Sequence, residues 1–148
     1  MKIRKREEGQ GLVEYALVLV LVAVIIIAIL TVLGSAVVGV YARVLAGLNG
    51  QVLTGSGTEY IVGGYDLAVD CSGGPAIVTV SDMSVIVMQD GEPAGNTAVS
   101  ITVQTSSNSG IANGTSNANG TASGMSVTVV GGSCPNGTVK IGNVSTGY

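Results

Sequence analysis

The 148-residue sequence contains no histidine, no tryptophan and no phenylalanine, and it has only two cysteines. Histidine is the commonest general base and the commonest metal ligand, so its absence removes every Ser-His-Asp and Cys-His arrangement. Neither a phosphate-binding loop nor a dinucleotide-binding fingerprint occurs in the sequence. We therefore expect a protein that is not an enzyme and that holds no cofactor and no metal ion.

Charged residues are also scarce, at 10% of the chain, and they are unevenly placed. Four of the six basic residues lie within the first six positions, and only Arg43 and Lys140 follow them. Basic flanks of membrane segments stay cytoplasmic, so the N-terminus should lie inside the cell and the rest outside. Removal of residues 1–9 would leave two basic and seven acidic residues, a net charge near -5. This balance argues against nucleic-acid binding.

The chain does contain one long apolar run, from Leu12 to Leu33, in which the only clearly polar residues are Glu14, Tyr15 and Thr31. As a helix these 22 residues would be about 33 Å long, enough to cross the hydrocarbon core of a membrane. Glu14 is unusual there, because a carboxylate at mid-membrane costs about 2.5–3.5 kcal/mol, and less near the interface. Such a residue normally has a partner or a function.

The helix should continue beyond Leu33, because the apolar pattern persists to Leu48 and Asn49-Gly50 is the first strong stop signal. A helix from Leu12 to Leu48 would be about 55 Å long, so its last turns must leave a bilayer. Ala42 and Ala46 have the spacing of small residues that let two helices approach closely, although small residues are also ordinary in apolar helices.

The sequence after Asn49 has a β-type composition, rich in Gly, Ser, Thr, Asn and Val. Alternation of apolar and polar residues predicts six strands, separated by turn-forming residues, that suggest an antiparallel sandwich. The low-complexity stretch from Thr105 to Gly124 is interpreted as a solvated loop, or else as a decorated or ligand-contacting surface. The predicted strands are 60–69, 76–80, 83–88, 98–104, 126–130 and 138–144.

Cys71 and Cys134 both lie in the part of the chain that we expect to be exported, where they would form a disulfide; two unpaired thiols are the alternative. Four Asn-x-Ser/Thr sequences are candidate glycosylation sites. Three of them are Asn-Gly-Thr, and Asn-Gly is also a favoured turn, so turn formation is the preferred explanation for most of these sites. The four asparagines are Asn113, Asn119, Asn136 and Asn143.

The stretch from Gly9 to Tyr15, Gly-Gln-Gly-Leu-Val-Glu-Tyr, followed by Ala-Leu-Val-Leu, resembles the N-terminus of type IVb prepilins of the Flp class, which tight-adherence secretion systems make. The resemblance covers roughly residues 4–33. It implies that a membrane prepilin peptidase cuts after Gly9 and leaves Gln10 as the new terminus, with Gly11 as the rival cut site. It also implies that Glu14 and Tyr15 act in filament assembly, where the glutamate pairs with the terminal amine of a neighbouring subunit.

The C-terminal region has a weaker resemblance, to bacterial immunoglobulin-like domains. It is carried by the turn sequences Asp90-Gly91-Glu92-Pro93-Ala94-Gly95 and, later, 115–122. We therefore expect an α+β fold, a long N-terminal apolar helix followed by a small antiparallel β-sandwich of immunoglobulin-like type. The expected segments are a leader (1–9), a transmembrane and filament-core helix (10–49), a linker (50–58) and a surface domain (59–148).

Taken together, these features predict a structural pilin subunit, held in the inner membrane as a precursor and then assembled into an extracellular homo-oligomeric filament. The expected partners are copies of the same chain, the prepilin peptidase and the pilus assembly machinery, but no nucleic acid. The β-domain would serve in adhesion or surface contact. The alternative is a permanently membrane-anchored surface binding protein or a minor pilin-like assembly component.

Overall fold

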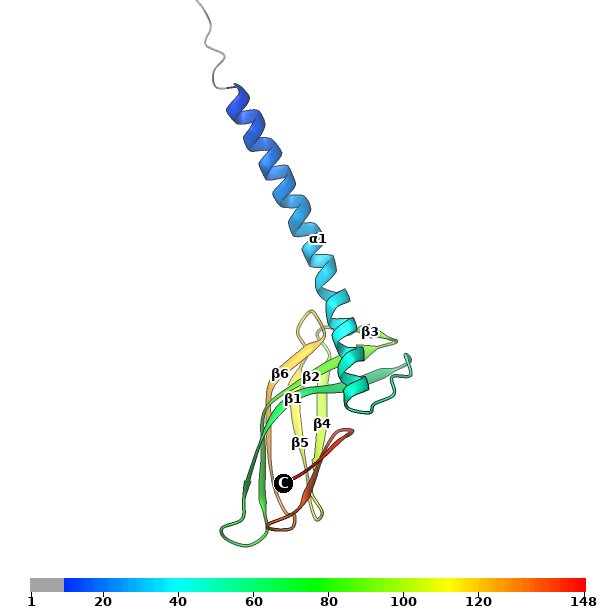
Figure 1. Cartoon of the computed structure of the whole chain (residues 1–148), viewed down its shortest axis with the longest axis vertical. Coiled ribbons are helices and arrows are strands. Elements are labelled where there is room, and N and C mark those ends of the chain that lie inside the picture. Colours follow the sequence, from blue (N-terminus) through cyan, green and yellow to red (C-terminus); the bar gives the residue numbers. More distant parts are fainter. Residues whose placement is uncertain (1–9) are drawn as a thin grey trace, which may run out of the picture. The chain divides into compact units, whose positions relative to one another are not determined.

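The structure, a computed structural model, describes residues 10–148 (Figure 1). The expected leader, with the cleavage residue Gly9, lies outside the described residues. The chain divides into two compact units, of which the first ends at Gly34 and the second runs from Ser35 to Tyr148. Each unit is described on its own below.

One helix, α1 (Gln10–Leu48), occupies the described part of the first unit and the start of the second. Its 39 residues correspond to about 58 Å of helix. Leu, Ile, Val and Ala fill 28 of the 39 positions, and no proline interrupts the backbone hydrogen bonds. The helix ends where the sequence predicts, because Gly50 adopts a positive φ of 68° and the Gln51 backbone N–H donates to the Ala46 carbonyl.

The rest of the second unit consists of eight strands in two antiparallel sheets (Figure 1). In the first sheet β1 pairs with β2, and β2 pairs with both β3 and β6; in the second the order is β5-β4-β7-β8. The prediction of a long apolar helix followed by antiparallel sheets is confirmed. The strands are β1 (Thr58–Asp70), β2 (Ile77–Gln89), β3 (Glu92–Pro93), β4 (Ala98–Gln104), β5 (Ser109–Thr115), β6 (Thr121–Val130), β7 (Thr138–Ile141) and β8 (Val144–Gly147).

A single apolar core lies between the two sheets. The longer strands contribute alternate residues to it, as a two-residue side-chain period requires. β4 shows the pattern most clearly, because Val99, Ile101 and Val103 are buried while the residues between them are exposed. The opposing sheet contributes mainly valines and Met83 and Met125, so the core is aliphatic and contains little aromatic surface.

The interpretation of residues 105–124 as a loop is wrong, because β5 and the first residues of β6 lie within this stretch. The inward-facing residues of β5 are Gly110, Ala112 and Gly114, which give no hydrophobic alternation. Glycine is required there, because a Cβ on Gly114 would lie 2.7 Å from the Met125 sulfur. Small residues allow β5 to lie against the side chains of β6. Because they produce no alternation of apolar and polar residues, the strand is not predicted from the sequence.

Two other strand predictions differ from the structure. Residues 76–80 and 83–88 belong to one strand, β2, whose register with β1 and β6 shifts around Asp82, which has a φ of 48°. The pair Ser81-Asp82 therefore marks an irregularity within one strand, and not a turn between two strands. Residues 138–144 divide into β7 and the start of β8, because Gly142, with a φ of 56°, reverses the chain.

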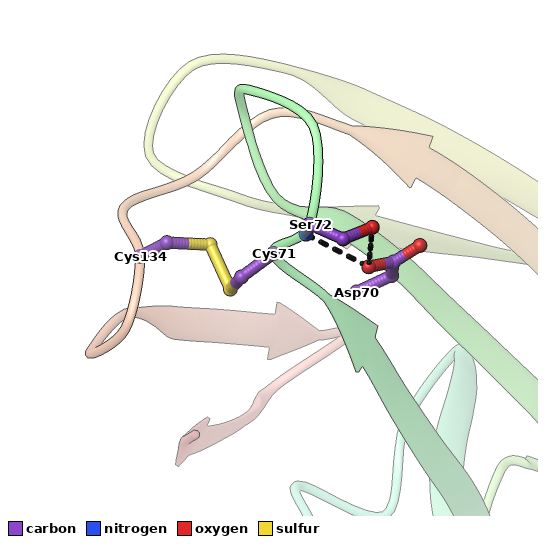
Figure 2. Close-up of a disulfide and its surroundings, with 4 residues drawn as sticks. All are labelled: Asp70, Cys71, Ser72 and Cys134. Carbon is purple, nitrogen blue, oxygen red and sulfur yellow. Dashed lines mark hydrogen bonds between the residues drawn. A yellow bond between two sulfur atoms is a disulfide. The ribbon is translucent and has the colours of Figure 1, made fainter.

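The predicted disulfide between Cys71 and Cys134 is confirmed (Figure 2). Cys71 follows β1, and Cys134 lies in the connection that leads from β6 in one sheet to β7 in the other. The bridge closes a loop with a sequence separation of 63 residues. On the chain-entropy account, such a loop stabilises the folded state by about 4 kcal/mol. The disulfide thus ties the two sheets together where the aliphatic core ends.

One buried polar side chain, Ser116, joins two turns of the second unit. Its hydroxyl accepts from the Thr97 backbone N–H at 2.9 Å and donates to the Ala94 carbonyl at 2.8 Å. Its backbone N–H donates to the Thr97 carbonyl at 2.9 Å. Ser116 therefore connects the segment between β3 and β4 with the segment between β5 and β6.

Ser116→Ala is expected to lower the free energy of unfolding by about 1–3 kcal/mol, since it leaves two partly buried backbone groups without a partner. The full chain in detergent, unfolded with denaturant and followed by circular dichroism of the sheets, provides the measurement. Ser100→Ala is the matched control, because the Ser100 hydroxyl bonds to Asn113 on the exposed surface. Equal destabilisation by the two variants would contradict the role of Ser116.

Candidate functional site: the exposed surface of helix α1

The most unusual surface of this protein is the apolar side of α1 in the first unit. Its large side chains are exposed throughout, from 44% at Val22 to 75% at Leu12. The most apolar 18-residue stretch of α1 has a mean hydropathy of 3.5, so the helix is long and apolar enough to cross a membrane. A surface of this kind is not stable in water and requires lipid or other apolar side chains around it.

Glu14 lies on this surface one turn after the start of α1, beside Tyr15, whose side chain is also exposed. From Gln10 to Ala42 it is the only charged residue in the sequence. Neighbouring positions on the helix therefore offer it no cation. Gln10, the residue that would become the N-terminus after cleavage, is the first residue of α1. The helix thus places Glu14 four residues from that terminus.

In the second unit the last turns of α1 pack on the outer face of the sheet that contains β1 and β2. Ala42 and Ala46 are fully buried there, against Ile61 of β1 and Ile86 and Met88 of β2. The small residues that suggested helix–helix contact therefore bring the helix close to a sheet. Gly39 continues the same face, since a Cβ at this position would lie 3.8 Å from the Pro93 ring.

The connector after α1 reinforces this contact through hydrogen bonds to the free edge of β1. The Asn49 side-chain amide donates to the Val62 carbonyl at 2.9 Å, and the Gln51 amide donates to the Tyr60 carbonyl at 3.0 Å. Further along, the Thr54 backbone N–H and hydroxyl both donate to Glu59 and hold the pKa of that carboxyl below its usual range. The end of α1 is thus held on the sheet both by the apolar contact of its last turns and by the hydrogen bonds of the connector.

The opposite side of the same turns remains exposed and apolar. Five residues spaced at three or four positions form a continuous stripe, here called the outer stripe. Its members lie roughly half a turn away from Ala42 and Ala46 on the helix surface, and Val40 is 60% exposed. The outer stripe consists of Val37, Val40, Tyr41, Val44 and Leu48. Docking on the sheet therefore covers only one side of an apolar helix.

Other features of the second unit offer less chemistry. One hollow, of about 390 Å³, lies between the connector, the edge of β1 and β4, and is open to solvent. One buried atom faces no partner there, the Gln51 side-chain oxygen. Within residues 10–148 no three acidic or sulfur side chains are grouped as metal ligands.

The four candidate glycosylation asparagines are all exposed but lie in different settings. Asn113 is on β5, where its side-chain oxygen accepts from the Ser100 hydroxyl at 2.7 Å. Asn119 is in the turn before β6, as its Asn-Gly sequence suggests, and Gly120 has a φ of 80°. Asn136 precedes β7 and Asn143 lies between β7 and β8. The structure does not gather them on one surface.

Two features of the α1 surface were missed by sequence reasoning: the packing of its last turns on the sheet and the outer stripe. A helical wheel of residues 37–48 would separate the alanine side from the valine side, so the signal was present. Comparison of the chain with protein-family models, curated proteins and solved structures finds no match. Function has therefore to be inferred from the helix surface and its single carboxylate.

Ala42→Leu is expected to destabilise the second unit by about 1–3 kcal/mol, because no space is available for a larger side chain between α1 and the sheet. The measurement is thermal unfolding of the full chain in detergent, together with hydrogen exchange of the amides around Ile61 and Ile86. Val40→Leu, on the outer stripe of the same turn, is the control and should leave both readouts unchanged. Similar effects of both substitutions would show that the alanine side is not a packing face.

Proposed function

We propose that this chain is a structural pilin-type subunit that is cut after Gly9 and polymerises through α1 into a surface filament of the type IV, Flp or tight-adherence kind. The observation that carries the proposal is an apolar helix, exposed over most of its length, with one carboxylate in its first turns. The β-domain would be displayed on the filament for adhesion or surface contact. A prepilin peptidase and the pilus assembly machinery are the implied partners.

The exposed apolar surface supports two successive environments for the helix. Residues 12–33 are long enough to span the inner membrane, so a precursor can be held there with its basic N-terminus in the cytoplasm. The outer stripe extends the apolar surface to Leu48, beyond the reach of one bilayer. Packing of α1 against the helices of other copies would cover both regions at once. A filament core provides such a continuous apolar environment.

Glu14 supports the proposal because a buried anion requires a compensating cation. After cleavage every subunit would carry one new N-terminal amine, four residues before its own Glu14. The sequence from Gln10 to Ala42 supplies no other charge, so the amine of a neighbouring copy is a suitable partner. The carboxylate is unfavourable in lipid and favourable in a filament, which biases the helix toward assembly.

The two antiparallel sheets with a shared aliphatic core are consistent with a β-sandwich of immunoglobulin-like type, which we include in the proposal. A disulfide across the two sheets is typical of domains that fold outside the cytoplasm. The exposed asparagines, if modified, would lie on the filament surface. An extracellular display domain therefore accounts for the composition of the second unit.

The competing function is a permanent membrane anchor for a surface binding protein, or a minor pilin-like component. The length and hydropathy of α1, taken alone, fit a membrane anchor as well as they fit a pilin subunit. An anchor, however, gives no role to Glu14 or to the outer stripe. Abundance separates the two functions, since a major pilin should dominate sheared surface material while an anchored protein stays with the membrane.

The first test is the N-terminus of the protein in sheared filaments from cells that contain a prepilin peptidase. Mass spectrometry should find a chain that begins at Gln10. A chain that begins at Leu12 would move the cut to Gly11 and keep the processing mechanism. An intact Met1 terminus in such cells would refute the proposal.

The second test is Glu14→Gln, which removes the charge and keeps the size of the side chain. We expect the variant to accumulate in the membrane at the normal level, and its filament yield to fall more than tenfold because the intersubunit ion pair is lost. Thr31→Val, which removes a polar group from the same helix, is the control and should assemble normally. Normal filaments from Glu14→Gln would remove the role of the carboxylate.

A further inference from the structure

Charge is segregated between the two sheets of the second unit. All six acidic residues after α1 lie between Glu59 and Glu92, that is, in β1, β2, β3 and the turn between β2 and β3. From Ala94 to Tyr148 the sequence contains one charged residue, Lys140 on β7. One sheet is therefore acidic, and the other carries a single cation.

The acidic sheet has an outer surface that α1 does not cover, here called the acidic face. Along β1, Leu67 and Val69 turn toward the core, so Asp66, Ala68 and Asp70 point to the opposite side and are exposed. Asp70 pairs with Ile77 of β2, which in turn pairs with Val130 of β6. Ile77 and Val130 are 39% and 50% exposed. The acidic face comprises Asp66, Ala68, Asp70, Ile77, Thr128 and Val130.

The carboxylate of Asp70 is held in a fixed position on this face (Figure 2). The Ser72 hydroxyl donates to it at 2.6 Å and the Ser72 backbone N–H donates at 2.9 Å. These two donors hold the pKa of Asp70 below its usual range, so the group remains ionised. The neighbouring Cys71–Cys134 bridge anchors the segment that carries it.

The second sheet has a matching outer surface, here called the basic face. Most of its exposed side chains are small and uncharged. The exceptions are Lys140, which is charged, and Ile111, an apolar side chain that is 58% exposed. Lys140 pairs with Gln104 of β4 on one side and with Ser145 of β8 on the other. The basic face comprises Ser100, Thr102, Ile111, Asn113, Lys140 and Ser145.

We propose that the acidic face of one copy packs on the basic face of the next copy, with Lys140 paired to Asp66 or Asp70. The inference rests on the proposed filament, and it adds a contact between β-domains to the contact between helices. The arrangement follows from charge. Contact between two acidic faces would bring four carboxylates together. Contact between two basic faces would bring two ammonium groups together. Only the unlike pairing is attractive.

Such a contact is heterologous, so each copy keeps one unused face and the chain of copies can continue. A filament requires this property, whereas a self-complementary contact would close into a dimer. Ile77, Val130 and Ile111 supply apolar surface at the contact, and the ion pair selects the orientation. Lys140 is suited to the role because the other basic side chain in residues 10–148, Arg43, lies on α1 with its guanidinium 3.5 Å from the Gly91 carbonyl.

Zero-length carbodiimide cross-linking of sheared filaments tests the contact directly, because it joins an amine only to a carboxylate in contact with it. Lys140 is the only lysine of the chain after residue 9. We expect a ladder of covalent oligomers, in which mass spectrometry identifies Lys140 joined to Asp66 or Asp70. Lys140→Arg is the matched control, since it keeps the charge and the filaments but removes the reactive amine. Cross-links formed by the N-terminal amine of the cleaved chain would persist in this control, which distinguishes them from cross-links formed by Lys140.

Charge reversal provides the second arm. Lys140→Glu should lower filament yield at least threefold, and adding Asp66→Lys or Asp70→Lys should restore it. Oxidation of Cys71 and Cys134, seen on a non-reducing gel, shows that each variant has folded. Normal yield from Lys140→Glu, or cross-links from Lys140 only to other carboxylates, would overturn this contact and leave the pilin function intact. Absence of filaments from the wild-type protein would instead overturn the proposed function and this contact with it.

Discussion

The covering of one apolar helix is the constraint on which the rest of this protein depends. α1 exposes large aliphatic side chains over most of its length, and water is an unfavourable environment for them. The second unit covers one side of its last turns with Ile61, Ile86 and Met88. Everything else on the helix requires lipid or other apolar side chains around it. In the proposed filament, Glu14 would make the choice between lipid and neighbouring helices an electrostatic one.

The β-domain is built so that the last turns of α1 can pack closely on a sheet. Ala42 and Ala46 allow close approach, Gly39 meets Pro93, and the amides of Asn49 and Gln51 cover carbonyl groups on the edge of β1. An edge strand with free backbone groups is otherwise open to unwanted pairing. The junction thus serves two purposes, since it positions the helix and protects the edge.

Stability in the β-domain has to come from close packing and from covalent closure, because no aromatic side chain is among the fully buried residues of the core. Glycines on β5 let the two sheets approach, the hydroxyl of Ser116 satisfies backbone groups between turns, and the disulfide closes the far end. Few charges are left on the surface, and those that remain are sorted between the sheets. This sorting gives the domain two different outer faces, which the proposed filament would use.

The sequence alone determined the long apolar helix and its end at Leu48, the antiparallel sheets and the disulfide pair. These depend on local signals: a continuous apolar run, an Asn-Gly stop, two-residue alternation and a count of two cysteines. Only the tertiary structure decided that β5 is a strand, that β2 is continuous through Asp82, and that Ala42 and Ala46 face a sheet. Small residues carry no hydrophobic signal of their own, and their role is set by the neighbour that approaches them.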